Sequence, residues 1–389
     1  MIGDKFFYNL AMSLVKNCLA GVFILCAATS WAANLSFDFH PKISALGFYT
    51  SPTNTKTKNY GAGQIVLPAS VFIDDKFLLQ AEYFFAYDYF NKETDFYDKL
   101  NRAAVAFDTQ YFSLKAGRDF LDLNLNSIIY FGPYQNRDLK KPTYFDGALA
   151  SFRPFDIVEL SLVGGKYKNL DFYGAALAVS YLKGFYFLSK ENDLDLSTYG
   201  AAFNMESENF AFNLLAAFNN GKKSKSFLGI TLEDNYKGKI FAGDIKLKKD
   251  KEDFKSEVYL GIEYLSPDKE NSLGFKPIMA NLDRGFIFGN ITEGLDILTY
   301  KLGLSFTPKN IKGLSADIKI YNFSSTDKRK TSRDIASEVD LSLEYKFSAF
   351  SAQILYGYLQ ARQGFSSYSS GFEDKPKINK LGFILSYQF

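Results

Sequence analysis

The sequence alternates apolar and polar residues in many stretches of about ten residues. In one such stretch the apolar positions are Val339, Leu341, Leu343, Tyr345 and Phe347, and the polar positions between them are Glu338, Asp340, Ser342, Glu344 and Lys346. The same period of two recurs in 254–264, 298–306 and 381–389. Successive side chains of a β-strand point to opposite faces of its sheet. The sequence therefore predicts an all-β protein whose strands have one apolar and one polar face.

A soluble β-sandwich and a transmembrane β-barrel both produce this alternation, and two features favour the barrel. The chain has 40 Phe and 26 Tyr, which gather at both ends of many apolar faces, as expected at membrane interfaces. Short turns are expected at 153–154, 206–208 and 348–349, between longer polar segments at 51–59, 91–98, 220–225, 323–335 and 362–376. Short turns on one rim and long loops on the other are typical of outer-membrane barrels, whose closed sheets satisfy the backbone in hydrocarbon. We therefore expect a transmembrane antiparallel β-barrel.

The alternation divides the chain into nineteen approximate strands. They are 35–50, 60–73, 76–90, 99–108, 111–117, 144–152, 156–166, 170–182, 183–190, 196–205, 209–219, 225–233, 237–248, 254–265, 296–307, 314–323, 337–347, 351–361 and 380–389. A bacterial barrel with both ends in the periplasm has an even number of strands. Either 286–289 belongs to a further strand, or one strand is divided in two upstream of 266–295. We expect about eighteen strands, within a range of sixteen to twenty.

The first 32 residues resemble a secretory signal peptide. Residues 18–29 are apolar, Lys5 and Lys16 precede them, and 30–32 supply small residues for a peptidase. This run is too short to cross a bilayer as a helix. We expect 1–32 to be removed and 33–389 to form a barrel in a Gram-negative outer membrane. Both cysteines lie in the signal, so we expect neither a disulfide nor a thiolate site in the barrel.

Charge and motifs narrow the range of functions. Lys and Arg total 45 and Asp and Glu total 43, so no strong overall field attracts nucleic acid. The single histidine, His40, has no nucleophile or acid beside it in a recognisable motif, and no metal-ligand cluster or phosphate-binding loop occurs. We expect neither enzymatic activity nor a cofactor or metal. The expected partners are outer-membrane lipid, a hydrophilic solute or polysaccharide and, because the terminal Phe389 resembles a barrel-assembly signal, the barrel-assembly machinery.

Several segments resemble the alginate-export-like family of outer-membrane proteins. They are 114–119 (LKAGRD), Asn136 with Arg137, 143–147 (TYFDG), 262–268, 274–278 (GFKPI), 288–289 and 338–341 with 345–347. The region of Pro277 lacks the Asp-Pro-Leu form of the family, and the basic residue before Gly289 is Arg284. The resemblance implies an eighteen-stranded monomeric barrel that conducts a charged polysaccharide or a similar solute out of the periplasm.

The polar faces of the strands predict a lumen of mixed charge. The expected acids are Glu82, Asp88, Glu159, Asp244, Glu257, Glu263, Asp317, Glu338, Asp340 and Glu344, and the expected bases are Arg102, Lys115, Lys246, Lys248, Lys255, Lys301, Lys319 and Lys346. A channel for a polyanion would instead offer a ladder of Lys and Arg. These charges either line the substrate pathway or pair across neighbouring strands and stiffen the wall.

The candidate pathway residues are Arg102, Lys115, Arg118, Arg137, Asp146, Lys301, Lys319, Glu338, Asp340, Glu344 and Lys346. Arg118 shares its parity with Phe112 and Leu114, so it faces lipid unless the strand has ended or bulges at Gly117. Arg118, Arg137 and Asp146 either form a cluster at the mouth or constriction, or form a structural ion pair that holds 118–143.

The predicted function is a porin-like channel for small or oligomeric hydrophilic solutes, and the alternative is a non-conducting surface barrel that acts as an adhesin or receptor through its loops. The basic loop 323–335 is either a solvated loop or a collector of anions. Segment 266–295 either narrows the lumen or projects outward to bind partners.

Overall fold

The computed structural model describes residues 35–51, 59–88, 97–125, 128–131, 143–192, 194–227, 230–266, 275–277, 284, 286–291, 296–330, 332–367 and 376–389. The predicted signal peptide lies outside these residues. No described helix is long and apolar enough to cross a membrane.

Most of the described chain is β-strand. The first strands are β1 (Leu35–Phe39), β2 (Lys42–Ser51), β3 (Tyr60–Ile73), β4 (Phe77–Asp88), β5 (Tyr97–Asp108), β6 (Phe112–Asp119), β7 (Leu121–Leu125), β8 (Ile129–Phe131), β9 (Phe145–Phe155), β10 (Val158–Tyr167) and β11 (Leu170–Val179). The later elements are β12 (Leu182–Glu191), β13 (Leu194–Glu206), β14 (Phe210–Phe227), β15 (Ile230–Asp250), β16 (Phe254–Leu265), α2 (Phe288–Ile291), β17 (Ile297–Pro308), β18 (Leu314–Ser325), β19 (Asp334–Phe347), β20 (Phe350–Ala361), the 3₁₀ turn η1 (Phe365–Ser367) and β21 (Lys377–Gln388).

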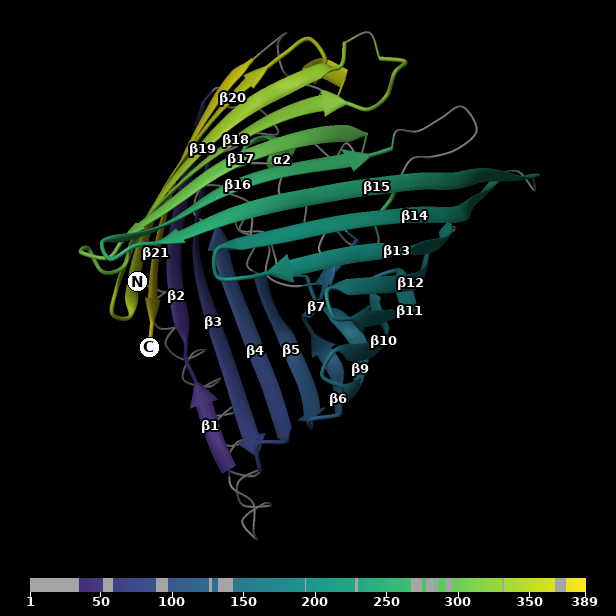
Figure 1. Ribbon diagram of the computed structural model, residues 1–389, viewed down its shortest axis with the longest axis horizontal. Coiled ribbons are helices and arrows are strands. Elements are labelled where there is room, and N and C mark those ends of the chain that lie inside the picture. Colours follow the sequence, from purple (N-terminus) through teal and green to yellow (C-terminus); the bar gives the residue numbers. More distant parts are fainter. Residues whose placement is uncertain are drawn as a thin grey trace, which may run out of the picture.

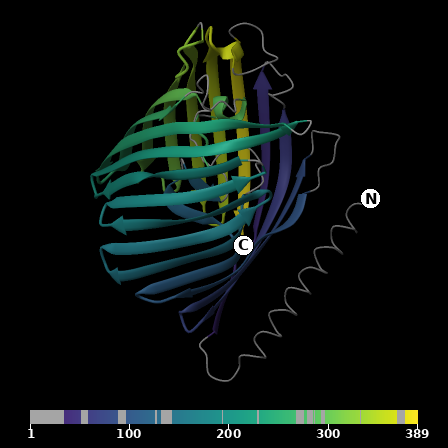
Figure 2. The ribbon, with the colours of Figure 1, turned by 90° about the vertical axis from the view of Figure 1, so that its right-hand side faces the viewer.

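The strands form one closed antiparallel sheet. Neighbouring wall strands pair in chain order, and β21 closes the ring by pairing with β2, with Leu385 opposite Ala45. Figure 2 shows the C-terminal strands (yellow) beside the N-terminal strands (purple). Strands β1 and β2 both pair with β3 and form a single strand interrupted at His40 and Pro41. Nineteen segments minus this one interruption give an eighteen-stranded barrel, which confirms the expected fold class and strand number.

The extra strand predicted at 225–233 is wrong. Residues 225–227 end β14 and residues 230–233 begin β15, which are paired partners in one long hairpin. The loop predicted at 220–225 is likewise part of β14. The polar run 219–226 breaks the alternation of the sequence, but a strand that extends beyond the membrane has no need of an apolar face. Residues 286–289 add no strand, because they form a turn and the start of α2.

The two rims differ in their connections. On one rim all eight connections are short, at 74–76, 109–111, 156–157, 180–181, 207–209, 251–253, 309–313 and 348–349. The turn predicted at 153–154 is displaced, because both residues lie within β9. The opposite rim carries every long connection, although 168–169, 192–193 and 228–229 are short there too. We call these the short-turn rim and the long-loop rim. In Figure 1, β2–β5 run close to vertical and β13–β15 run close to horizontal.

The apolar strand faces point outward. On β17 and β19 the exposed apolar side chains are Tyr300, Leu302, Leu304, Phe306, Leu341, Leu343, Tyr345 and Phe347. On the opposite face of β19, Glu338 and Asp340 are buried. A closed sheet with an apolar exterior suits a hydrocarbon environment, because no strand edge is left open.

The two largest of the four buried apolar clusters in the described residues lie inside the barrel. Leu121, Leu125, Ile129 and Phe131 of the β7–β8 hairpin pack against inward side chains of β9–β15, and Phe131 stacks on Phe172 with ring centres 5.2 Å apart. The second cluster joins 287–288 to inward side chains of β17–β21. The inner wall is therefore covered at two places by segments that fold inward from the long-loop rim.

Candidate functional site

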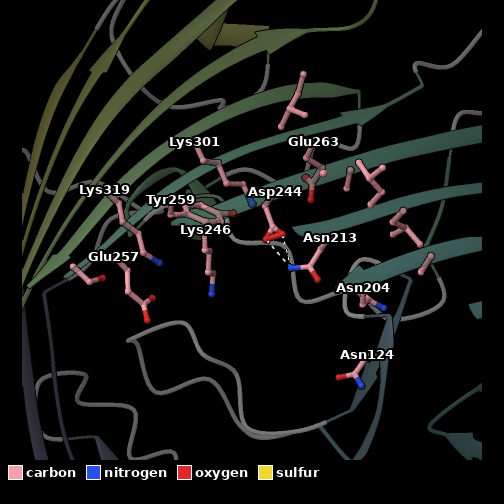
Figure 3. A pocket seen from close by; sticks show the side chains of 18 of the residues that line it. Asn124, Asn204, Asn213, Asp244, Lys246, Glu257, Tyr259, Glu263, Lys301 and Lys319 are labelled. Atoms are coloured by element: carbon pink, nitrogen blue, oxygen red, sulfur yellow. Dashed lines mark hydrogen bonds between the residues drawn. The ribbon is translucent and has the colours of Figure 1, made fainter. Parts of the chain in front are cut away.

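A polar cavity of about 630 Å³ lies against the inner face of β13–β18. Its polar lining consists of Asn124, Asn204, Asn213, Asp244, Lys246, Glu257, Tyr259, Glu263, Lys301, Ser305, Asp317 and Lys319. Figure 3 labels all of these side chains except Ser305 and Asp317, and shows them projecting from several adjacent strands into one space, with Asn124 of the inner hairpin facing them. The cavity is thus part of the lumen, with the barrel wall on one side and β7 on the other.

Strand alternation brings these charges together. Asp244 and Lys246 occupy successive inward positions of β15, and Glu257, Tyr259 and Glu263 share the inward parity of β16. Lys301 on β17 stands opposite Gly261, and Lys319 on β18 stands opposite Gly303. Because a period of two sends every second residue inward, four neighbouring strands supply the acids and bases of one cavity.

Two glycines leave room for Tyr259 along the wall. A Cβ at Gly261 would lie 2.8 Å from the Tyr259 Oη, and a Cβ at Gly303 would lie 3.4 Å from the Tyr259 Cδ1. The Lys246 Nζ is 5.8 Å from the centre of the Tyr259 ring. The tyrosine therefore lies along small residues, which keeps the adjacent cavity open.

Two acids of the cavity accept hydrogen bonds from neighbouring side chains, whereas two of its bases form no ion pair with any described residue. Asn213 donates from Nδ2 to both carboxylate oxygens of Asp244 at 3.1 and 2.9 Å, and the Ser305 hydroxyl donates to Asp317 at 2.5 Å. Within the described part of the chain, Lys246 and Lys301 form no ion pair. Their ammonium groups therefore keep hydrogen-bond donors for a solute in the cavity.

Arg102 and Lys115 face the lumen elsewhere and are compensated there. The Arg102 Nε is 2.7 Å from the Asp119 Oδ1, and the Lys115 Nζ is 2.5 Å from the Asp119 Oδ2. Arg102 also donates to the Gln80 Oε1 at 2.6 Å. Asp119 is almost completely buried. This group links β4, β5 and β6, and its two bases share the single carboxylate of Asp119.

Glu338 and Asp340 hold an inward segment against the wall. The backbone N–H of Phe286 donates to Asp340 at 2.8 Å, and those of Ile287 and Phe288 donate to the two oxygens of Glu338 at 2.6 and 2.8 Å. Near the same segment, the buried pair Arg284 and Glu263 lies 3.4 Å apart. Glu338 and Asp340 bind backbone amides, so their immediate role is to position 286–288.

Glu344 and Lys346 lie near the short-turn rim. They continue the inward parity of Asp340 along β19 and pair with each other at 3.3 Å. They are remote along the strand from the acids that hold 286–288, so the structure does not unite all the candidate pathway residues in one site.

The candidate residues Arg118 and Asp146 face outward. The Arg118 guanidinium pairs with both oxygens of Asp146 at 2.8 and 3.0 Å and lies 4.4 Å from the centre of the Tyr144 ring. Gly117 has a φ of +120°. The inward and outward positions of β6 nevertheless continue to alternate past it, because Asp119 is buried inside the barrel and Arg118 points outward. The pair joins the end of β6 to the start of β9, so it connects the two ends of the intervening segment 119–145. Arg137 lies outside the described residues.

The loop at 326–333 is organised by Asp327. Its carboxylate accepts from the Arg329 side chain at 2.8 and 2.9 Å and from the Arg329 backbone N–H at 3.0 Å. Hydrogen bonding to Arg329 lowers the pKa of Asp327 to about 2. Lys330 pairs with Asp296 at 3.0 Å. Part of the basic charge predicted for this loop is therefore engaged within the protein.

Asn124, Asn204 and Asn213 were not predicted as site residues. Asn204 and Asn213 occupy inward positions by the alternation of β13 and β14, which the sequence pattern could have revealed. Asn124 could not be placed from the sequence, because it depends on the inward fold of β7. In the described part of the chain, no group of three or more His, Cys, Asp or Glu could hold a metal ion.

Comparison with known proteins identifies the fold. No protein-family model matches the sequence, and no curated protein matches it. Solved structures do match. The outer membrane protein opdK of Pseudomonas aeruginosa is 12% identical over 90% of this chain and 99% of its own, with a TM-score of 0.58. OccK5 (OpdH) of Pseudomonas aeruginosa is 13% identical over 90% and 98%, with a TM-score of 0.57. OccAB3 of Acinetobacter baumannii is 10% identical over 90% and 100%, with a TM-score of 0.59. The chain is similar to these proteins in fold, which is that of an eighteen-stranded outer-membrane β-barrel.

Proposed function

We propose that the protein is a passive outer-membrane channel for small hydrophilic solutes. The observation that carries this proposal is the polar cavity inside a barrel whose exterior is apolar. Lys246 and Lys301 face this cavity without an ion pair to any described residue. Charged groups that are fixed at a lumen surface lower the entry barrier for solutes of opposite charge.

The mixture of charges favours solutes that carry both signs or a single weak charge. Asp244 and Lys246 lie on β15, and Lys301 lies on β17 beyond the intervening β16, so both signs of charge face one cavity. A uniform polyanion would meet repulsion from the acids wherever it met attraction from the bases. A short zwitterion, by contrast, can place each charged end beside its complement.

The resemblance to alginate-export-like proteins supports a second candidate solute, a charged polysaccharide. Lys246, Lys301 and Lys319 come from β15, β17 and β18 and form a short series of bases in the cavity. Such a series is the feature that a linear acidic chain needs for passage. An adhesin or receptor would bind its partner through the loops, so it would not need a lysine without an ion pair in the lumen.

Liposome swelling would distinguish these functions. Vesicles that contain the purified, heat-modifiable protein would be diluted into isotonic solutions of neutral sugars, amino acids and acidic oligosaccharides of increasing length. The proposal expects fast swelling with small zwitterionic and neutral solutes and a sharp decrease with length. Fast entry of long acidic oligosaccharides would favour polysaccharide transport, and no swelling with any solute would favour a non-conducting adhesin or receptor.

A further inference from the structure

A row of charged side chains crosses the outer wall near the long-loop rim. Its members stand opposite one another on seven successive wall strands, from β6 to β14, and they are Arg118, Asp146, Lys166, Asp171, Lys190, Asp195 and Lys222. Their charges alternate in sign without exception. We call this row the charged belt.

The charged belt faces outward along its whole length. Each member has the parity of exposed apolar residues on its own strand, such as Tyr173 on β11 and Leu188 on β12. Side chains of Lys190 and Asp195 are 62% and 72% exposed. Charged groups on the outside of a barrel are costly at the bilayer midplane and tolerated near the interfaces.

The position of the charged belt fits an interface. Lys190 lies eight residues along β12 from Leu182, which is at the short-turn end of the strand. The outward positions between these two residues carry no charged side chain. Eight residues span about 26 Å along a strand, which is about 20 Å along the membrane normal at a usual tilt of about 40°. This distance is close to the apolar thickness of an outer-membrane barrel. The charged belt therefore lies at the level of the outer-leaflet headgroups.

A groove opens on the outer wall at the charged belt. It has a volume of about 500 Å³, and its lining includes Tyr173, Leu188, Lys190, Asp195 and Lys222. Tyr173 and Leu188 continue the apolar surface of the wall, whereas the two lysines flank Asp195 on the neighbouring strands. The groove thus combines an apolar floor with a positively charged border.

Lys190 in this groove can bind a further anion. Lys190 and Asp195 are 3.8 Å apart, which is longer than a direct hydrogen bond, and an ammonium group has three donors. Arg118 differs, because its guanidinium is engaged bidentately by Asp146. Across the belt four bases alternate with three acids.

We propose that this groove binds the phosphorylated headgroup of an outer-leaflet glycolipid, with Lys190 and Lys222 beside the phosphate and an acyl chain along Tyr173 and Leu188. The inference rests on the outer-membrane location in the proposed function. Basic pockets at membrane surfaces recognise anionic headgroups in this way, and an apolar floor that is continuous with the lipid face distinguishes a lipid from a free anion.

The test measures lipid retention by the purified full chain in neutral detergent, using native mass spectrometry. The probes are lipopolysaccharide with intact lipid A phosphates, the same glycolipid after dephosphorylation, inorganic phosphate and phosphatidylcholine. The expected result is that the protein retains the phosphorylated glycolipid, and that Lys190→Gln with Lys222→Gln weakens its binding about thirtyfold. Asp195→Asn should strengthen binding, because it removes the carboxylate between the lysines.

The control variant is Lys312→Gln, an exposed lysine in the turn 309–313 at the short-turn rim. It should bind the glycolipid like the natural chain. Equal binding of the dephosphorylated glycolipid, unchanged affinity in the double variant, binding of inorganic phosphate alone, or a dimer that depends on Lys190 and Lys222 would overturn the inference. Channel activity of the double variant is measured on the same preparation, so loss of lipid binding with intact conductance separates this inference from the proposed function.

Discussion

Glu338 accepts a hydrogen bond from the backbone N–H of Ile287 at 2.6 Å, inside the barrel and across 51 positions of sequence. The second carboxylate oxygen accepts from Phe288, and the Glu338 side chain is fully buried. A residue of the β19 wall therefore fixes the inward segment 286–291. The width of the lumen beside β17–β21 depends on this contact.

Replacing Glu338 by Gln should loosen the inward segment. An amide has one acceptor oxygen, so at least one of the two backbone N–H groups loses its partner, at a cost of about 1–3 kcal/mol. Single-channel recordings should show more frequent changes of conductance level than in the natural protein. Glu344→Gln, on the same strand face near the short-turn rim, is the control and should not raise the frequency of these changes. Equal behaviour of both variants would show that Glu338 does not hold the segment.

Lys301 should control ion selectivity. Its ammonium group faces the cavity and forms no ion pair within the described residues, so Lys301→Gln removes an uncompensated positive charge from the lumen. The reversal potential across a salt gradient should shift toward greater cation preference. The shift should be larger than for Lys115→Gln, because Asp119 already compensates Lys115 at 2.5 Å. A larger shift for Lys115→Gln would place the selective region elsewhere.

A side chain at Gly261 should narrow the cavity. A Cβ there would lie 2.8 Å from the Tyr259 Oη, so Gly261→Val should push the tyrosine into the lumen and lower the unitary conductance. Gly184 lies on the outward face of β12, where a Cβ would meet no atom within 4 Å, so Gly184→Val is the matched control. If both variants conduct like the natural protein, Tyr259 does not border the pathway.

Asp327 should make the loop 326–333 sensitive to acid. The Arg329 guanidinium lowers the pKa of Asp327 to about 2, below the ordinary Asp value of 3.8. A lowered pKa contributes stability that is present above about pH 4 and is lost as the pH falls toward 2. Peptic cleavage of this loop should therefore increase between pH 4 and pH 2 in the natural protein, whereas in Asp327→Asn it should already be high at pH 4. Parallel profiles for the two proteins would contradict this assignment.

The sequence predicts the wall best where one strand face is apolar and the other is polar. Leu341 and Leu343 lie outside and Glu338 and Asp340 lie inside, because a period of two leaves no other arrangement in a membrane barrel. On β12 both faces are apolar, since Phe185 and Phe187 point inward while Tyr186 points outward. When both faces of a strand are apolar, alternation does not show which segment packs on the inner face. The β7–β8 hairpin, which covers the inner face of β12, was therefore not predicted.

Some features depend on contacts that sequence spacing does not encode. Leu121, Leu123 and Leu125 alternate with polar residues, which is a strand signal, but their position inside the barrel depends on the apolar inner face of β9–β15. The hairpin of β14 and β15 was divided incorrectly because its outer part is polar on both faces. Sequence reasoning therefore found the lumen charges and held the inward fold of 266–295 as one of two alternatives, but it did not predict the inner hairpin of β7 and β8.

Single-channel recording in a planar bilayer is the most direct test of a water-filled polar lumen in this barrel. The protein, purified in detergent and shown to be folded by heat-modifiable migration, should insert with discrete steps of steady conductance, and Lys301→Gln should alter the ion preference of those steps. Folded protein that inserts without conductance would contradict the channel.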